Sequence, residues 1–340
     1  MSSIPRIGID AMGGDFGPQP VAEGAALAFR EWPGRFQLTL VGDEAEIRAA
    51  LKRAHADSLP IEIVHAPEKI DMGAKAAKAA RKSGSSLAVL TQLHKERKVD
   101  ALFSAGNTGA VVATATLGLG RLPGVSRPAL AAFFPNIGEG TVVLDVGANA
   151  EVKPSYLVQF AHMGSCYARH LLGRPEPRVG LLSIGEEDSK GNQLVQETLP
   201  LLREAKHLHF IGNVESRDIF KGTCDVVVTD GFTGNVVLKT AESVATFLGG
   251  VAKREIKRDP VAMLGALFMG GALKRLNKQL DWEEYGAAPL LGVDGVCFVG
   301  HGASRAKAFR SAIRTLTTFV EQRVNEHIRE EIQSDHVTAA

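Results

Sequence analysis

Short apolar runs alternate along this chain with longer segments in which apolar residues recur every three or four positions. The short runs are rich in β-branched residues and have the length of buried strands, as at residues 4–9, 37–41, 61–65, 178–184, 207–211 and 226–229. The longer segments have the spacing of amphipathic helices, as at residues 21–30, 44–53, 85–98 and 156–172. This alternation predicts an α/β protein with a mostly parallel sheet and helices on both faces, a three-layer α/β/α Rossmann-like arrangement.

Some parts of the pattern depart from this simple alternation. Residues 129–135 and 141–145 predict two strands joined by a short polar turn, which indicates an antiparallel pair or an excursion at the edge of the sheet. Towards the carboxyl end we expect a loop at 285–292, a last strand at 293–299 and one closing helix at 305–329.

A helical excursion with an apolar tip is predicted for residues 240–282. The helix that follows the strand at 226–229 continues into this segment, and residues 261–273 carry no charge. Basic residues bracket the uncharged tip, namely Lys253, Arg254, Lys257, Arg258, Lys274, Arg275 and Lys278. The tip is too short to span a bilayer, so we expect either an anchor at the membrane surface or a contact that buries it in the core or in a dimer.

The composition fits one large α/β domain over residues 1–335 and narrows the range of partners. The chain has 340 residues, is 45% hydrophobic and carries a formal net charge of +1. This balance gives no global attraction to nucleic acid, so any anion must be recognised locally. The three cysteines form no Cys-x-x-Cys pair, which favours free thiols in the cytoplasm. We expect no signal peptide and no membrane-spanning segment.

One strand–turn–helix motif occurs twice. The first copy begins at Asp100 and the second at Asp225, an offset of 125 residues, and both contain Gly-x-Thr-Gly. A glycine-rich turn between a strand and a helix N-terminus offers free N–H groups to an anion. We therefore expect phosphate at one of the two turns, which form two crevices or two walls of one crevice. The candidate binding residues are Ser104, Gly106, Asn107, Thr108 and Gly109 in the first copy, and Asp230, Gly231, Thr233, Gly234 and Asn235 in the second.

Other polar groups follow predicted strands, which is where α/β proteins place their ligands. Asp10 and His301 stand beside glycines at strand ends, and Lys153 precedes a long helix, so these three are the candidate catalytic residues. The alternative for Lys153 is a solvated lysine. Three consecutive acids at 186–188 are expected to cap a helix and contact a lysine rather than hold a metal. Further candidates for binding substrate are Gly13, Gly14, Asn149, Lys190, Asn192, Asn213 and Gly302.

Together these motifs resemble those of the PlsX family of phosphate acyltransferases. The matching stretches run over nearly the whole chain, at residues 9–15, 104–110, 144–149, 184–187, 190–192, 212–215, 230–236 and 301–302. The resemblance implies a fold similar to that of the phosphotransacetylase and isocitrate dehydrogenase group. It also implies an enzyme that forms acyl phosphate from acyl–acyl carrier protein and inorganic phosphate, for the synthesis of phosphatidic acid and other bacterial phospholipids.

The resemblance further implies a homodimer in the cytoplasm that associates peripherally with the membrane and supplies a membrane glycerol-phosphate acyltransferase. One departure is Val299, at a position where the family commonly has a lysine, so we expect no phosphate contact from this side chain.

The implied reaction needs neither a cofactor nor a metal. Phosphate is largely dianionic near neutral pH, and a thiolate departs easily from a thioester. The protein would mainly hold phosphate beside the thioester and stabilise the oxyanion. Two other interpretations are a phosphotransacetylase-type enzyme that uses acyl-coenzyme A and a non-catalytic anion-binding scaffold in a membrane complex.

Overall fold

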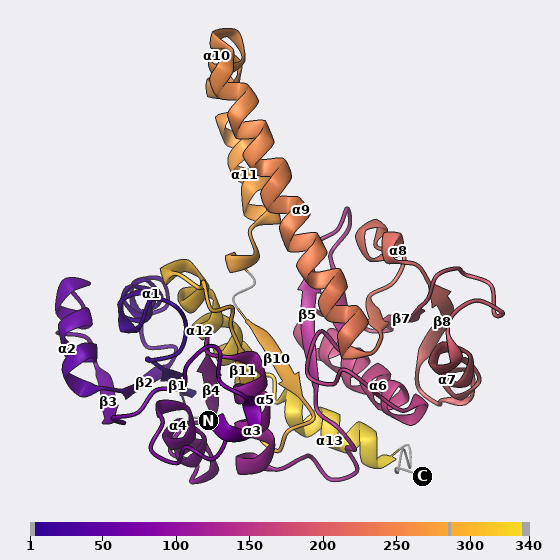
Figure 1. Ribbon diagram of the computed structural model, residues 1–340, viewed down its shortest axis with the longest axis horizontal. Helices are drawn as coiled ribbons and strands as arrows, with labels where there is room; N and C mark the ends of the chain where they lie inside the picture. The colour runs from indigo at the N-terminus through magenta and orange to yellow at the C-terminus, as the bar shows by residue number, and fades with distance from the viewer. Residues whose placement is uncertain (1–3, 285–286, 335–340) are drawn as a thin grey trace.

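The computed structural model describes residues 4–284 and 287–334, and within them eleven strands form one sheet (Figure 1). The strands are β1 (Arg6–Asp10), β2 (Gln37–Gly42), β3 (Ile61–His65), β4 (Ala101–Ser104), β5 (Ala129–Phe134), β6 (Thr141–Leu144), β7 (Arg178–Leu182), β8 (His209–Val214), β9 (Val226–Val228), β10 (Ala288–Leu291) and β11 (Cys297–Val299). Their order across the sheet is β3-β2-β1-β4-β11-β10-β5-β6-β9-β7-β8. Neighbours are parallel except at the centre, where β11, β10, β5 and β6 form three antiparallel pairs.

The two halves of the sheet repeat one strand order outward from the centre. From β10 the order is β11, β4, β1, β2, and from β5 it is β6, β9, β7, β8. The parallel and antiparallel pairings correspond at every step. Because β5 and β10 are antiparallel, the halves are related by an approximate twofold rotation and their corresponding strands run in opposite directions. The two copies of the Gly-x-Thr-Gly motif follow the corresponding strands β4 and β9.

A matching ion pair connects β1 with β4 in one half and the corresponding strands β7 and β9 in the other. In the first half, Arg6 at the start of β1 donates from its backbone N–H (2.8 Å) and its guanidinium (2.7 Å) to the carboxylate of Asp100, just before β4. In the second half, Arg178 at the start of β7 donates from its N–H (2.9 Å) and its Nε (2.9 Å) to Asp225, just before β9. The offset of the sequence motif therefore reflects a structural duplication that also includes this ion pair.

Helices cover both faces of the sheet, as the sequence predicts (Figure 1). One face buries its core against α1 (Pro18–Glu31), α2 (Glu44–Arg53), α6 (Pro154–Leu171), α7 (Gln193–Glu204), α12 (Ala306–Glu321) and α13 (Val324–Ser334). The opposite face packs against α4 (Ser86–Lys95), α5 (Thr108–Leu119), α8 (Ser216–Lys221) and the beginning of α9 (Gly231–Arg258), with α3 (Ala76–Ala79) beside α5. The three-layer α/β/α fold is thus confirmed.

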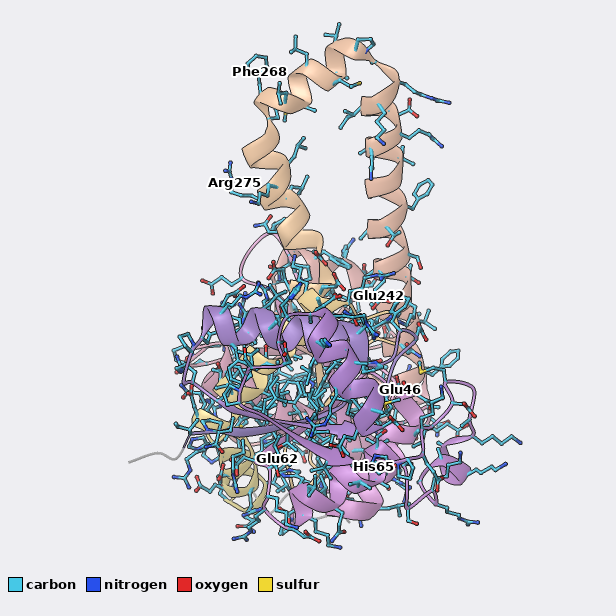
Figure 2. All side chains as sticks on the ribbon, turned by 90° about the vertical axis from the view of Figure 1, so that its left-hand side faces the viewer. Glu46, Glu62, His65, Glu242, Phe268 and Arg275 are labelled. Carbon is cyan, nitrogen blue, oxygen red and sulfur yellow. The ribbon has the colours of Figure 1, made fainter. Side chains whose placement is uncertain are left out.

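A long arm projects from this body (Figure 1). It consists of the distal part of α9, then α10 (Pro260–Phe268) at the tip, then α11 (Gly270–Leu280), which returns towards the body and leads to a short 3-10 helix at Trp282–Glu284. Figure 2 shows Glu242 near the base of the arm and Phe268 towards its far end. Within the described residues, α10 has no buried side chain, so the tip does not pack into the core of its own chain.

The structure corrects the prediction for the carboxyl-terminal third in two places. Of the segment predicted as a loop at 285–292, residues 285 and 286 lie outside the described residues, and residues 288–291 form β10, a central strand that contains Pro289. The closing helix predicted at 305–329 is instead two helices, α12 and α13. They separate at Arg323, whose φ of 52° is in the left-handed region and is incompatible with a continuous α-helix. The antiparallel pair predicted near 129–145 is confirmed as β5 and β6, at the centre of the sheet rather than at its edge.

Candidate active site

A cavity of about 690 Å³ lies where the two halves of the sheet meet. Its polar lining comes from the loops after β4 and β11 and from the beginning of α9, and it includes Gly106, Thr108, Asn235, His301 and Gly302. Its apolar lining comes mainly from β5, β10 and the end of α6. The volume is within the range of ligand-binding pockets, so this cavity is the leading candidate for the active site.

The first Gly-x-Thr-Gly turn forms the N-terminus of α5 at this cavity. Asn107 caps the helix, because its Oδ1 accepts from the N–H of Ala110 (2.9 Å), while its Nδ2 donates to the carbonyl oxygens of Met72 and Ala74. Val111 donates its N–H to the Asn107 carbonyl oxygen (3.0 Å), which closes the first turn. The N–H groups of Thr108 and Gly109 precede that hydrogen bond and are not needed within the helix. Both residues are exposed, so their N–H groups suit an anion.

Asp10 lies beneath this turn and is not part of the cavity wall. Its carboxylate accepts from Ser104 Oγ (2.7 Å) and from the N–H groups of Met12 and Gly13 (3.1 Å each). Ser104 Oγ in turn accepts from the N–H of Gly106 (3.1 Å). Burial raises the pKa of Asp10, and these hydrogen bonds oppose the shift. These contacts connect the loops after β1 and β4.

Close approach between loops explains the glycine pair after β1. A Cβ on Gly13 would lie 2.8 Å from Asp10 Oδ2 and 2.9 Å from the nitrogen of Gly106, so a side chain there would push the loops apart. Gly14 has a φ of 92°, in the left-handed region that glycine adopts readily. The N–H of the next residue, Asp15, donates to the carbonyl oxygen of Gly302 (2.9 Å). The loops after β1, β4 and β11 are therefore held together as one wall.

His301 follows β11 and lies exposed at the cavity. Its Nδ1 accepts from the N–H of Ala303 (3.1 Å). In the neutral tautomer that this hydrogen bond selects, the ring proton is on Nε2. Val299, two residues earlier, is buried and adds an apolar surface to the same cavity.

The second Gly-x-Thr-Gly turn packs against protein. Gly231 donates its N–H to the Asn149 carbonyl oxygen (2.8 Å), and a Cβ on Gly234 would lie 1.9 Å from the Asp145 carbonyl oxygen. Asp230 caps α9 by accepting from the N–H (2.8 Å) and the Oγ1 (2.7 Å) of Thr233. This turn thus has less room for an anion than the first.

Asp145 is a buried residue of this region that the sequence analysis did not select. Its carboxylate is fully buried and accepts five hydrogen bonds, from the N–H groups of Leu130, Gly147, Ala148 and Asn149 and from Asn149 Nδ2. Burial raises the pKa of Asp145 in spite of these bonds. The sequence does carry a signal for this residue, because Asp145 directly follows a buried strand, and Asp10 likewise stands at the end of one. Asn149, which was selected, also donates to the Pro128 carbonyl oxygen (2.7 Å) and shapes this loop.

A second cavity of about 440 Å³ lies in the half of the sheet that contains β7 and β9. Asn192, Asp230 and Thr233 line it, whereas the exposed Lys153 and Lys190 line neither cavity. The motif copies therefore contribute to two crevices. Asn235 and the following turn of α9 reach the first cavity, so the second copy also supplies part of that wall.

The remaining candidate residues form local contacts. Asn213 Nδ2 donates to the Glu187 carbonyl oxygen (3.1 Å), next to the acids at 186–188. Of these acids, Glu186 pairs with Arg217 (3.2 Å) and Asp188 with Arg203 (2.6 Å), so their partners are arginines rather than the expected lysine. In the part of the chain that the structure describes, no three histidine, cysteine or acidic side chains gather as a metal site would require. Nor does any helix of residues 4–284 and 287–334 combine the length and apolar character of a membrane span.

Solved structures place this architecture in a known class. A phosphotransacetylase from Streptococcus pyogenes superimposes with a TM-score of 0.62 at 17% identity, covering 94% of this chain and 95% of that one. The EutD phosphotransacetylase from Staphylococcus aureus gives 0.59 at 15% identity, covering 94% of each chain. The protein is therefore an α/β protein with the phosphotransacetylase fold.

Comparison of sequences identifies the family within this class. The model of a family described as "Fatty acid synthesis protein" matches residues 5–327. The phosphate acyltransferase of Pelotomaculum thermopropionicum is 47% identical over 336 residues, which are 98% of this chain and 97% of that protein. That of Thermus thermophilus is 49% identical over 332 residues, 98% of this chain and 100% of that protein. The chain belongs to the PlsX family of phosphate acyltransferases and is an enzyme.

Proposed function

We propose that this enzyme transfers an acyl group from acyl carrier protein to inorganic phosphate, as a step of bacterial phospholipid synthesis. The observation that carries the proposal is the shared wall formed by the α5 N-terminus and His301, in a cavity whose remaining lining is largely apolar. Backbone N–H groups at a helix N-terminus suit phosphate, and an apolar surface suits a fatty acyl chain. Membership of the family supports phosphate and an acyl donor as the two substrates.

The proposed reaction needs positioning and charge stabilisation from the protein. Phosphate held by the N–H groups of Thr108 and Gly109 attacks the thioester carbonyl carbon, and the carbonyl electron pair moves onto oxygen. His301 Nε2–H stabilises this oxyanion. When the carbonyl re-forms, the C–S bond breaks and the sulfur leaves as thiolate. The proton of monohydrogen phosphate ends on the thiol, so the products are acyl phosphate and free carrier thiol.

The test is release of free thiol from two donors, acyl–acyl carrier protein and acyl-coenzyme A, each with and without phosphate. We expect release to require phosphate and kcat/KM to be at least about tenfold higher for the carrier-protein donor, because a protein donor offers further contact surface. Equal or better use of acyl-coenzyme A would favour the phosphotransacetylase-type alternative. Release from neither donor would favour the non-catalytic scaffold.

We also propose that the arm mediates dimerisation along its stem and membrane contact at its tip. On the stem, Val244, Phe247 and Leu248 form one exposed apolar stripe at helical spacing. A stripe of this kind on a projecting helix suits the same stripe of a second copy. At the tip, Leu267 and Phe268 are 75% and 83% exposed. An enzyme held peripherally at the cytoplasmic membrane surface in this way would release acyl phosphate next to a membrane glycerol-phosphate acyltransferase.

A further inference from the structure

The centre of the sheet is split between β5 and β10. These strands pair only at Leu130 with Leu290 and at Ala129 with Leu291. Continuation of the ladder would bring Ala131 opposite Pro289 and Ala132 opposite Ala288, but neither pair is formed in the described residues. Pro289 has no N–H to donate to a ladder. The two strands therefore diverge and leave a slit in the middle of the sheet.

The 690 Å³ cavity reaches both faces of the sheet at this slit. On the face of α5 and α9 its lining includes Ala132 and Val299, which belong to the core of that face, and Ala288, which packs against that core. On the face of α6 and α12 its lining includes Ala131 and Tyr167, which belong to the opposite core. The cavity is therefore a passage through the sheet, with the α5 N-terminus and His301 on one side only.

The passage has a polar mouth and an apolar interior. Its charged lining residues lie on helices and loops at its two ends, namely Asp15, Lys239 and Glu242 on the side of the mouth and Arg314 on the far side. The residues of β5 and β10 that line the slit are small or apolar, namely Ala131, Ala132, Phe133, Ala288 and Pro289. On the far side, Thr315 and Thr318 donate their hydroxyls to carbonyl oxygens of their own helix, so neither requires a polar ligand. Burial raises the pKa of Tyr167, which is therefore neutral at physiological pH.

We propose that the acyl chain of the donor passes through this slit, with its thioester at the polar mouth and its methyl end between α6 and α12. This inference rests on the proposed function and assigns the route of the chain. An unbranched chain fits because it is narrow and needs no polar partner along its length. The slit selects against bulky occupants, since strands on both sides restrict its width. Ala132 determines the width near the mouth, and Leu171 at the end of α6 limits the length at the far side.

The test measures the ratio of kcat/KM for a sixteen-carbon donor to that for a four-carbon donor. Ala132→Leu narrows the passage and should lower this ratio on the order of tenfold, the scale on which apolar pockets discriminate chain length. Leu171→Ala enlarges the far end. It should raise kcat/KM for donors with chains longer than the wild-type optimum, relative to kcat/KM for the four-carbon donor, so the two variants act in opposite directions. Leu201→Ala is the matched control, because Leu201 lies on α7 outside the cavity and is 40% exposed. It should leave the ratio unchanged.

Failure of this inference differs from failure of the proposed function. If the wild-type enzyme releases no thiol from either donor, the proposed function is wrong. If wild type is active and both Ala132→Leu and Leu171→Ala keep the wild-type ratio with an unchanged thermal midpoint, the chain follows another route. If Ala132→Leu does not fold, Leu171→Ala alone decides, since an unchanged length profile in that variant overturns the assignment.

Discussion

Two turns with the same residues have different surroundings in this enzyme. Gly109 stands exposed at the α5 N-terminus, where the nearest atom to an added Cβ would be Ala76 Cβ at 3.3 Å. Gly234 is buried, and an added Cβ there would lie 1.9 Å from the Asp145 carbonyl oxygen. The sequence alone could find both turns but could not separate an open turn from a packed one, because the distinction depends on a loop that is distant in the sequence.

This difference yields a prediction for substitution of the two glycines. Gly109→Val should raise the phosphate KM at least about tenfold with little change in stability, because the side chain obstructs approach to the helix N-terminus. Gly234→Ala should instead lower the free energy of unfolding by about 1–3 kcal/mol, as overpacking does. Steady-state kinetics in phosphate and thermal unfolding of both variants are the measurements. A normal phosphate KM in folded Gly109→Val would show that phosphate binds elsewhere.

His301 and Asp10 were both selected from the sequence as catalytic, but their environments are different. His301 is exposed, so His301→Ala should lower kcat by roughly 10²-fold, the scale of a lost oxyanion donor, while the thermal midpoint stays close to that of wild type. His301→Gln, which keeps an N–H donor, should recover part of the rate. Wild-type turnover in the alanine variant would exclude the histidine from the reaction.

Asp10 should influence stability in a pH-dependent way. Burial raises its pKa above the unfolded value of about 3.9, so the folded state binds the proton more tightly. This contribution to stability is fully present below the unfolded pKa and is lost as pH rises through the folded pKa. Compared with Asp10→Asn, which does not ionise, wild type should therefore lose unfolding free energy as pH increases above about 4. Urea unfolding of both proteins from pH 4 to 8 measures the difference, and parallel stability profiles would contradict this account of Asp10.

At the scale of elements, the arm is the clearest case of a helix pair without a core of its own. The sequence predicted its position from an uncharged tip bracketed by basic residues, because composition alone distinguishes such a segment. It could not predict that α10 and α11 would form separate helices that leave apolar side chains exposed, since exposure depends on whether the body folds back over them. The side chain of Lys278, one of the bracketing residues, lies outside the described residues.

The arm tip should bind anionic membranes reversibly. Each nearby basic residue contributes on the order of 1 kcal/mol with anionic lipid, and each fully inserted large apolar side chain adds roughly 1.5–3 kcal/mol. Liposome co-sedimentation of wild type should need anionic lipid and weaken with salt. A Leu264→Glu/Leu267→Glu/Phe268→Glu variant should lose binding but keep thiol release in solution. A matched stem variant, Phe247→Glu, should instead change the oligomeric state. If the tip variant dissociates or unfolds while the stem variant does not, the tip is a dimer contact.

The strand β10 and the break between α12 and α13 were not predictable from the sequence, because both depend on contacts with distant elements. Pro289 is a poor strand residue, yet β10 forms because strands flank it on both sides. Arg323 carries no sequence signal for a helix break; its left-handed conformation separates α12 from α13, and α13 packs against α6. Regular strands and amphipathic helices elsewhere were predictable, because their burial pattern is local.

At the scale of the whole molecule, the duplication organises both the fold and the site. The chain runs through a parallel unit (β1–β4), an antiparallel pair (β5, β6), a second parallel unit (β7–β9) and a second pair (β10, β11). The antiparallel pairs are exchanged between the two repeats: β6 pairs with β9 of the second parallel unit, and β11 pairs with β4 of the first. The sequence revealed the repeated turn but not this exchange, since no local pattern records which distant strands pair. The exchange brings β5 beside β10 and so creates the central cavity.

The central claim is that inorganic phosphate is the acyl acceptor in this cavity. The most direct measurement uses phosphate labelled with ¹⁸O at all four oxygens, together with an acyl–acyl carrier protein donor, and determines the mass of the intact product. We expect acyl phosphate that carries all four labelled oxygens, because a phosphate oxygen forms the new bond to carbon and no P–O bond breaks. We also expect that the labelled product falls with turnover in His301→Ala. Formation of free fatty acid without labelled acyl phosphate would mean that water is the acceptor, and would contradict the account.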